Sequence, residues 1–375
     1  MQNGKYVSAD GHVIEPMDLW QTRLDKRFRD RAPGIDSRPE GDYFLLEGHP
    51  PFPVGLEGAM INEKIAGEIK DLGGRRYTDS RPGAWDPQAR LADQDLDNLR
   101  ADVIYPGVGL LILGHPDAEF KRACLRVYND WLSELCSVAP DRLLGAGLLP
   151  LGGPVEWAIE EAERVIKKGL RSVSIPATVK DHPYFFREHD RLWAALEEMN
   201  VPVAIHAGTG KWPLFEEFAR TFRLEAIGLD LADARMGLPA RTIGDLMWGG
   251  VPQRYPKLRF VLVETGMGWI ASLLEFMDHW WNDHRRWMEP KLEESPSDYF
   301  HRQFWVTFEE DRSGIVTRDL LNVDHLMWGS DYPHTEGTFP RSQQQIAHDF
   351  VGVPETELRK IVWENAEQLY SIDVA

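Results

Sequence analysis

The sequence has 375 residues, of which 43% are hydrophobic and 27% are charged, a composition typical of a globular protein with a large core. Its formal net charge of −18 argues against nucleic acid and anionic membranes as partners. Neither a secretory signal nor a membrane span of ~18 apolar residues is expected. Because only Cys124 and Cys136 occur, no disulfide framework or CxxC metal site is expected, and the sequence predicts a cytoplasmic protein.

The first predicted element is a short apolar strand over residues 5–10, which ends at Asp10. Residues 16–90 then show no regular alternation and are rich in proline, glycine and charge. An irregular insertion of this length is uncommon unless it has a function, so we expect a lid over a site. A helix over 88–99 and a strand over 101–106 begin a regular pattern.

From there apolar strands and helices alternate. Further strands are predicted over 142–150, 170–176, 201–206, 259–264, 304–309 and 325–330. Helices are predicted over 117–138, 154–168, 190–199, 269–287, 313–321, 340–351 and 355–370. An insertion over 211–257 contains one more helix, which ends near Trp248.

Eight apolar strands separated by helices are the count and order of a (β/α)8 barrel. The pattern therefore predicts an α/β fold, a TIM barrel in a single domain over 1–375, with a long insertion after the first strand and a helical C-terminal segment over 355–375. A doubly wound open sheet is the structural alternative. It is disfavoured because no G-x-G-x-x-G turn follows the first strand.

Polar side chains follow several of the predicted strands at the point where each strand ends. In a (β/α)8 barrel these ends meet at one mouth, where active sites form. Asp10 and His12 are two residues apart, so an extended strand places both on one face, where they can bind one metal ion. The other strand-end residues are His206, Glu264, Glu309 and Asp331.

Each of these residues also has a purely structural interpretation. His206 lies among apolar residues and could be a hydrogen-bonded core histidine, although its place before Ala-Gly-Thr-Gly favours a ligand. Asp331 precedes Tyr-Pro, where turn aspartates are common, and Glu309 could begin a helix. Glu15 could be an exposed loop acid, and His334 could hold Asp331 or meet a substrate.

Carboxylates and imidazoles in this combination are the ligands that Zn, Mn and Fe bind in open catalytic sites. A bound divalent ion lowers the pKa of a water molecule or polarises a substrate oxygen. The sequence therefore predicts one or two divalent ions, held by residues drawn from Asp10, His12, Glu15, His206, Glu264 and Asp331. Tryptophans that suit an aromatic substrate are expected near the mouth, namely Trp248, Trp269, Trp305 and Trp328.

Four segments resemble the amidohydrolase superfamily, and within it the branch related to aminocarboxymuconate-semialdehyde decarboxylase. They are Ser8-Ala-Asp-Gly-His-Val-Ile-Glu-Pro16, His206-Ala-Gly, Glu264-Thr-Gly-Met-Gly-Trp269 and Trp328-Gly-Ser-Asp-Tyr-Pro-His334. The resemblance spans nearly the whole chain. It implies a distorted (β/α)8 barrel in which Asp10, His12, His206 and Asp331 bind the metal. It also implies non-oxidative decarboxylation of a small carboxylate and a homodimer, because dimers are frequent in the family.

One departure separates this chain from the decarboxylases that it resembles, which usually carry histidine at the end of strand six. Glu264 stands there instead. Glu264 could deliver a proton to the carbon that loses CO2. It could also activate water as a base, or help to bind a second metal ion.

These roles leave three reaction classes open. The first is decarboxylation, or related C–C bond cleavage, of a small cyclic or aromatic carboxylate, in which Asp331 or Glu264 delivers the proton while His334 and Glu15 orient the site. The second is hydrolysis of a C–C, amide or ester bond, with Asp331 as the base. The third is oxygenation at a dinuclear iron centre. The non-enzyme alternative, a barrel that only binds a ligand, is disfavoured by the full set of metal-binding residues.

Overall fold

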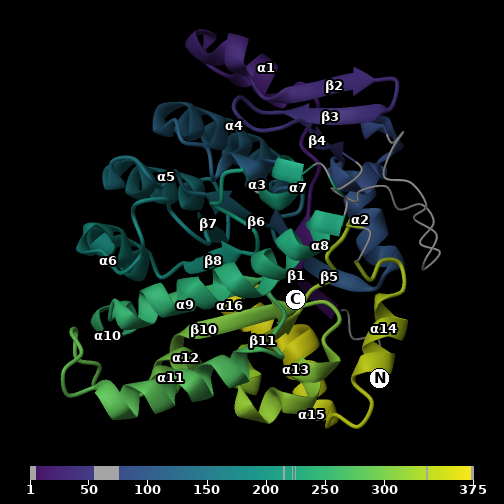
Figure 1. Cartoon of the computed structure of the whole chain (residues 1–375). Coiled ribbons are helices and arrows are strands. Elements are labelled where there is room, and N and C mark those ends of the chain that lie inside the picture. Colours follow the sequence, from purple (N-terminus) through teal and green to yellow (C-terminus); the bar gives the residue numbers. More distant parts are fainter. Residues whose placement is uncertain are drawn as a thin grey trace.

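The structure is a computed structural model, which describes residues 6–54, 76–213, 216–221, 223, 225–334 and 337–372. Within these residues eight parallel strands follow one another in chain order around a barrel (Figure 1). They are β1 Tyr6–His12, β5 Leu99–Tyr105, β6 Leu143–Leu148, β7 Ser172–Pro176, β8 Pro202–His206, β9 Arg259–Val263, β10 Phe304–Phe308 and β11 Leu326–Trp328. The expected (β/α)8 barrel is therefore confirmed.

The first and last strands close the barrel. A parallel bridge joins Gly11, in β1, to Tyr332, just past β11. Beside it the amide of Asp331 donates to the carbonyl of Asp10 at 3.0 Å, and the amide of His12 donates to the carbonyl of Tyr332 at 2.5 Å. The seam of the barrel therefore runs through residues that the sequence proposes as metal ligands.

Apolar side chains fill the interior of the barrel, as is usual for this fold. They come from every second position of the strands, for example Val7, Ala9, Ala101, Val103, Leu144, Ala146, Ala204, Val261, Val263 and Met327. The helix α16 Asn365–Tyr370 adds Leu369 and Tyr370 to this cluster. Because the strands are buried on both faces, they are continuous apolar runs in the sequence, which is why they could be predicted.

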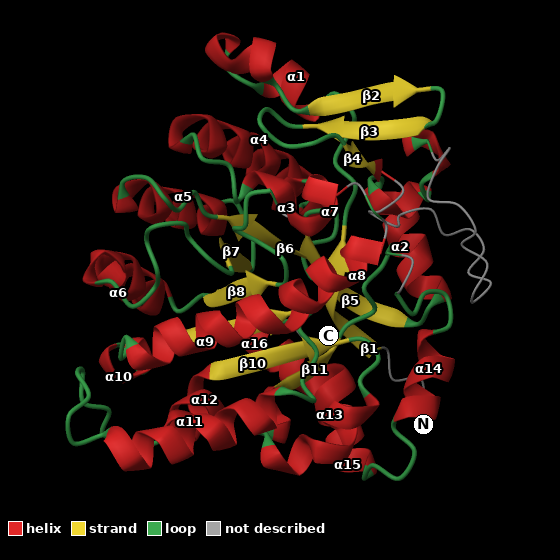
Figure 2. Ribbon diagram, viewed as in Figure 1, coloured by secondary structure: helices red, strands yellow, loops and turns green. Residues whose placement is uncertain are grey.

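Helices connect the strands and surround the sheet (Figure 2). The predicted ones are α2 Pro87–Leu96, α4 Ala118–Cys136, α5 Val155–Lys167, α6 Asp190–Met199, α9 Leu238–Trp248, α11 Ile270–His284, α13 Arg312–Thr317 and α14 Ser342–Asp349. Side-chain caps fix three of the starts, since Asp86 accepts from the Ala89 amide, Asp117 from the Phe120 amide and Asp311 from the Gly314 amide. None of the described helices is long and apolar enough to cross a membrane.

Short elements between the predicted ones escaped the sequence patterns. They are α3 Gly109–Ile112, α7 Glu216–Thr221, α8 Glu225–Ala232, α10 Val251–Arg254, α12 Pro296–Gln303, a π-helical turn Asp233–Gly237 and 3-10 turns at Lys26–Arg31, Tyr77–Asp79, Pro82–Ala84, Arg187–His189 and Val323–His325. The helix expected over 313–321 is divided into α13 and a 3-10 turn Arg318–Leu320. The helix expected over 355–370 is divided into α15 Glu355–Arg359, a π-helical turn Lys360–Glu364 and α16.

The segment after β1, expected to be irregular, contains regular structure. The helix α1 Leu19–Arg23 precedes an antiparallel sheet of β2 Gly34–Arg38, β3 Gly41–Leu45 and β4 Phe52–Pro53. Residues 55–75 of the expected insertion lie outside the described residues. The expectation is wrong for the part that is described, because these strands (GIDSR, GDYFL and FP) have neither a continuous apolar run nor a clear alternation.

This insertion contacts both the outer helices and the carboxyl end of the barrel. Trp20 donates from Nε1 to the carbonyl of Cys124 in α4 at 3.1 Å, and β2 and β3 lie beyond α4 at the top of Figure 1. The ring of His49 lies 5.2 Å from the ring of Trp212, in the loop that follows β8. The insertion is therefore anchored next to the loops at which the strand-end residues gather.

A buried ion pair beside the seam generates a prediction about stability. Arg90, on α2, is 2% exposed, and its Nε donates to Asp102 Oδ2 on β5 at 3.0 Å. We expect Arg90→Met to lower the free energy of unfolding by about 3–5 kcal/mol, because Asp102 becomes a buried charge without compensation. Urea denaturation followed by tryptophan fluorescence measures the change.

The matched control is Lys167→Met, which removes an exposed ion pair with Glu163 on α5. This substitution should change the free energy of unfolding by less than about 0.5 kcal/mol, because solvent screens the pair. Equal losses in the two variants would contradict the assignment of Arg90.

Candidate metal centre

Side chains from four strand ends converge at the carboxyl end of the barrel. Two overlapping groups of potential metal ligands form there, with the ligand atoms of each group within 4.8 Å of one another. One group is Asp10, His12 and His206, and the other is His12, Glu264, Asp331 and His334. Asp10, His12 and Asp331 are fully buried, and His206 is 1% exposed.

The imidazole of His12 lies at the centre of both groups. Its Nε2 lies 3.3 Å from His206 Nε2, 3.4 Å from Asp331 Oδ1 and 3.6 Å from Asp10 Oδ1. Glu264 Oε2 is 3.9 Å from His12 Nε2 and 3.4 Å from His206 Nε2. Metal–ligand bonds of about 2.1 Å place neighbouring ligand atoms roughly 3.0–3.4 Å apart. The spacing is therefore close to that of a set around one ion.

Backbone carbonyls fix the tautomer of both histidines. His12 Nδ1 lies 2.7 Å from the carbonyl oxygen of Pro106, and His206 Nδ1 lies 3.0 Å from that of Ala207. A carbonyl oxygen only accepts hydrogen bonds, so each Nδ1 carries the proton and donates. Each Nε2 is then left with a lone pair that faces the cluster, which is the arrangement of a metal-binding histidine.

The electrostatics of the cluster favour a cation. Burial lowers the pKa of His12 and of His206, so both imidazoles are neutral at pH 7. Burial raises the pKa of Asp10, and the Asp331 and Glu309 carboxylates raise it further. Asp10 Oδ1 is buried and accepts no hydrogen bond from any described residue. Neutral imidazoles beside buried carboxylates fit a divalent ion, which would compensate the negative charge.

The backbone at two of the acids is unusual. Glu264 has a φ of 58° and Asp331 a φ of 53°. These values lie in the left-handed region, which residues other than glycine rarely adopt. Hydrogen bonds hold both in place, since the Glu264 amide donates to Thr307 Oγ1 at 2.9 Å and the Asp331 amide donates to the Asp10 carbonyl. Such conformations concentrate at functional sites, and here they turn both carboxylates towards the cluster.

Two further residues proposed from the sequence have different positions. His334 lies beside the cluster, with Nδ1 2.9 Å from Asp331 Oδ1 and its ring stacked on that of His12 at 4.0 Å. Glu15 is buried but belongs to neither ligand group. Its Oε1 accepts a hydrogen bond from the amide of Gly109 at 3.0 Å. The structure therefore brings His334 to the centre and places Glu15 behind the loop that follows β5.

The sequence patterns missed Arg235 and Thr307. Arg235, on the π-helical turn Asp233–Gly237, donates from Nη2 to Glu264 Oε1 at 2.6 Å, and its Nη1 lies 3.4 Å from Glu309 Oε2. Thr307 donates from Oγ1 to Asp10 Oδ2 at 3.2 Å. Arg235 belongs to an insertion without periodicity, so no signal could have identified it. Thr307 lies two residues before Glu309, so in an extended chain both side chains face the same side. This spacing could have identified Thr307.

Burial strongly affects Glu309, the acid that directly follows β10. Burial raises the pKa of Glu309 to about 8. Arg235 lowers this pKa, whereas the carboxylates of Asp331 and Glu264 raise it. Glu309 is 7% exposed, and it faces the same side of the barrel end as the ligand cluster through its contact with Arg235.

The expectation that four tryptophans lie near the mouth is largely wrong. Trp305 stacks on His325 at 3.7 Å in a hollow that also contains Arg259, the first residue of β9, so it lies at the opposite end of the barrel. Trp328 is a core residue with 1% exposure. Trp248 ends α9, ten residues after Leu238, which carries it about 15 Å along the helix axis. Only Trp269, which donates to the carbonyl of Thr265 at 2.9 Å, lies beside Glu264.

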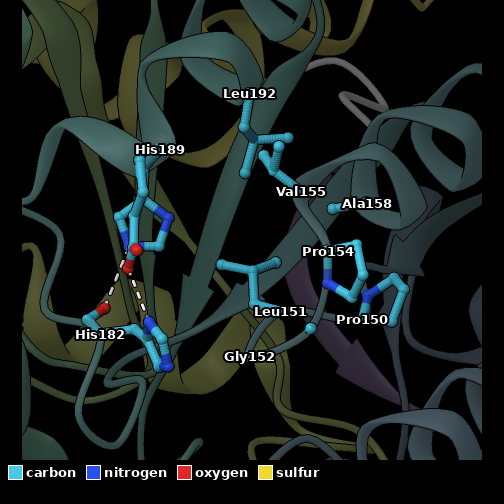
Figure 3. A pocket seen from close by; sticks show the side chains of 11 residues that line it. Pro150, Leu151, Gly152, Pro154, Val155, Ala158, His182, His189 and Leu192 are labelled. Carbon is cyan, nitrogen blue, oxygen red and sulfur yellow. Dashed lines mark hydrogen bonds and ion pairs between the residues drawn. The ribbon is translucent and has the colours of Figure 1, made fainter.

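A separate cavity of about 250 Å³ lies between α5 and α6 (Figure 3). Apolar residues such as Leu151, Val155 and Leu192 line much of it. At its edge His182 Nδ1 lies 2.7 Å from Glu188 Oε1, and His189 Nε2 donates to the carbonyl of His182 at 3.0 Å. None of the proposed metal ligands lines this cavity, and its histidines are held by neighbours, as a structural role requires.

Comparisons with known proteins relate this chain to decarboxylases. The chain is 29% identical over 324 residues to a gamma-resorcylate decarboxylase of Rhodococcus jostii, which covers 78% of this chain and 92% of that protein. It is 19% identical to a 2-amino-3-carboxymuconate-6-semialdehyde decarboxylase of Caenorhabditis elegans, over 81% of this chain and 85% of the relative.

Solved structures share the fold. An amidohydrolase of Mycobacterium avium subsp. paratuberculosis superposes with a TM-score of 0.79 over 100% of both chains, at 24% identity. A 5-carboxyvanillate decarboxylase of Novosphingobium aromaticivorans, in complex with manganese and a nitrobenzoic acid ligand, has a TM-score of 0.69 at 16% identity, over 99% of this chain and 97% of the other. The amidohydrolase family model matches residues 48–372, and the chain is therefore a member of the amidohydrolase family.

Proposed function

We propose that this protein is a metal-dependent, non-oxidative decarboxylase that acts on a small aromatic carboxylate. The observation that carries the proposal is the arrangement of Asp10, His206 and Asp331 around His12, with ligand atoms 3.3–3.6 Å from His12 Nε2. Similar family members are decarboxylases of resorcylate and 5-carboxyvanillate, and one of them contains manganese. We therefore expect Mn²⁺ as the ion.

In the proposed mechanism the protein must deliver a proton to a carbon atom. A divalent ion held by Asp10, His12, His206 and Asp331 would supply Lewis-acid chemistry towards a substrate oxygen. Loss of CO2 leaves an electron pair on the ring carbon, which takes up a proton. The Asp331 and His334 side chains, 2.9 Å apart, can hold that proton between them. Glu264 is already in an ion pair with Arg235, so we assign the proton to the Asp331–His334 pair.

The surroundings of the centre would keep water out. Asp10 and Asp331 are fully buried, and the ring of His334 covers that of His12. We further propose that the insertion over 16–90 acts as a lid, which the contact between His49 and Trp212 supports. The proposal also includes a single domain over 1–375 with the C-terminal segment 355–375, a small-molecule substrate, a cytoplasmic location and a homodimer.

A dinuclear centre is the second candidate. It is favoured by Glu264, whose Oε2 lies 3.4 Å from His206 Nε2 and adds a carboxylate to the ligand set. Two iron ions would open oxygenation chemistry, whereas an activated water with Asp331 as base would give hydrolysis. The number of bound ions and the fate of the substrate carboxylate distinguish these reactions.

Substrate tests address the reaction class directly. We expect the Mn²⁺-loaded protein to release CO2 from at least one hydroxylated benzoate, such as 2,6-dihydroxybenzoate or 5-carboxyvanillate, equally with and without oxygen. A chelator should abolish the release, and added Mn²⁺ should restore it. Coupled CO2 detection and an oxygen electrode measure both quantities. Oxygen consumption in step with turnover, or ester hydrolysis without CO2 release, would contradict the proposal.

Ligand substitutions address the metal assignment. We expect His12→Ala and Asp331→Asn each to lose bound metal and to lower kcat/KM by more than about 100-fold, since even outer partners of metal ligands cost 10–100-fold. Inductively coupled plasma mass spectrometry measures the metal content. The control is His279→Ala, on the exposed side of α11, where the side chain is 79% exposed. If both ligand variants keep their metal, the assignment is wrong.

Asp10 should make metal affinity depend on pH. Because the pKa of Asp10 is raised by burial and neighbouring acids, the metal-free protein holds a proton there above the ordinary aspartate pKa of ~4, and the ion must displace it. We therefore expect Mn²⁺ affinity to rise with pH and binding to release protons. Titration calorimetry in buffers of different ionisation enthalpy detects the release. Asp10→Asn should bind Mn²⁺ more weakly and without releasing this proton. An affinity of the wild type that does not depend on pH would contradict the expectation.

A further inference from the structure

The guanidinium of Arg235 lies between two acids at the rim of the metal centre. Its Nη2 donates to Glu264 Oε1 at 2.6 Å, and its Nη1 lies 3.4 Å from Glu309 Oε2. The side chain of Glu264 is 13% exposed and that of Glu309 is 8% exposed. This is not an ordinary surface ion pair, which solvent would screen, because both acids are nearly buried.

Glu264 is shared between Arg235 and the ligand cluster. Its Oε2 faces His206 Nε2 at 3.4 Å and His12 Nε2 at 3.9 Å, while its Oε1 is bound to Arg235. A carboxylate that bridges two cations has this arrangement, with one oxygen towards each. The cation on the outer side of Glu264 is the guanidinium.

The backbone holds Arg235 close to the strand end that carries His206. The amide of Gly208, two residues after His206, donates to the carbonyl of Ala234 at 3.3 Å. Asp233, at the start of the same π-helical turn, forms an ion pair with Lys211 at 2.9 Å. Both contacts tie the turn to the loop after β8, so the place of Arg235 is set by the residues on either side of it.

We propose that Arg235 is the second cation of this centre and that it makes the centre mononuclear. Glu264 Oε1 and Glu309 Oε2 are carboxylate oxygens that could otherwise bind a second metal ion, and Arg235 contacts both of them. An arginine remains charged at every physiological pH and presents several donors in one plane, so it can serve both acids at once. Arg235 is thus a positioning residue, which contacts Glu309 and holds Glu264 with Oε2 towards the metal ligands.

The inference rests on the proposed metal-dependent function, although its main test counts ions and needs no turnover. After equilibration with Mn²⁺ and removal of free ion, we expect one Mn²⁺ per wild-type chain and the electron paramagnetic resonance spectrum of an isolated ion. Arg235→Ala should bind a second Mn²⁺ and give a spectrum of coupled ions. Arg235→Lys retains a positive charge and should bind one ion.

The double variant Arg235→Ala/Glu309→Gln separates charge from space. It has the same room as Arg235→Ala but lacks one of the acids, so we expect it to bind one ion. Arg241→Ala, on the exposed side of α9 in the same insertion, is the matched control and should behave as wild type. Two Mn²⁺ per wild-type chain, or one Mn²⁺ with an isolated-ion spectrum in Arg235→Ala, would overturn the inference.

Activity provides a second measurement. Arg235→Ala should lower kcat/KM about 10- to 100-fold, as loss of an outer partner of a metal ligand does, and added guanidinium should restore part of it. A loss that guanidinium does not reduce counts against the positioning role. If the wild type binds one Mn²⁺ but releases no CO2 from any benzoate, the proposed reaction fails while the role of Arg235 stands.

Discussion

Negative charge buried at the carboxyl end of the barrel is the constraint on which the rest of the centre depends. Asp10 and Asp331 are fully buried, and Glu264 is nearly so. A buried carboxylate without a partner costs several kcal/mol, so the arrangement needs cations or bound protons to compensate the charge. The neutral, oriented imidazoles of His12 and His206 fit the same requirement, because they offer lone pairs to a metal and add no charge.

Much of the barrel could be predicted because its physical cause is local. Strands such as 259–264 are buried on both faces, which leaves continuous apolar runs in the sequence. The carboxyl ends of parallel strands meet at one mouth, so Asp10, His206 and Asp331 could be grouped without knowledge of their distances. The structure places these three residues around His12, as the grouping requires.

Other features depend on contacts between segments that are distant in the sequence. Arg235 belongs to an insertion with no periodicity, and only the folded chain brings it to Glu264, 29 residues away. Trp305 is close to Glu309 in sequence, yet it stands at the start of its strand and therefore at the other end of the barrel. The small sheet after β1 was not predicted because its strands contain no continuous apolar run. A functional residue type near a strand end can thus be recognised from the sequence. Its position along the strand decides at which end of the barrel it lies.

The position of the metal centre on the seam has a consequence for how the protein matures. Asp10 lies near the start of the chain and Asp331 near its end, and the two are joined directly across the closing strands. During synthesis the ligand set is incomplete until Asp331 has left the ribosome. An ion that binds there links the first and last strands of the barrel. It stabilises the closed barrel by RT ln(1 + [metal]/Kd). The supply of metal in the cell would then set the lifetime of the folded protein as well as its activity.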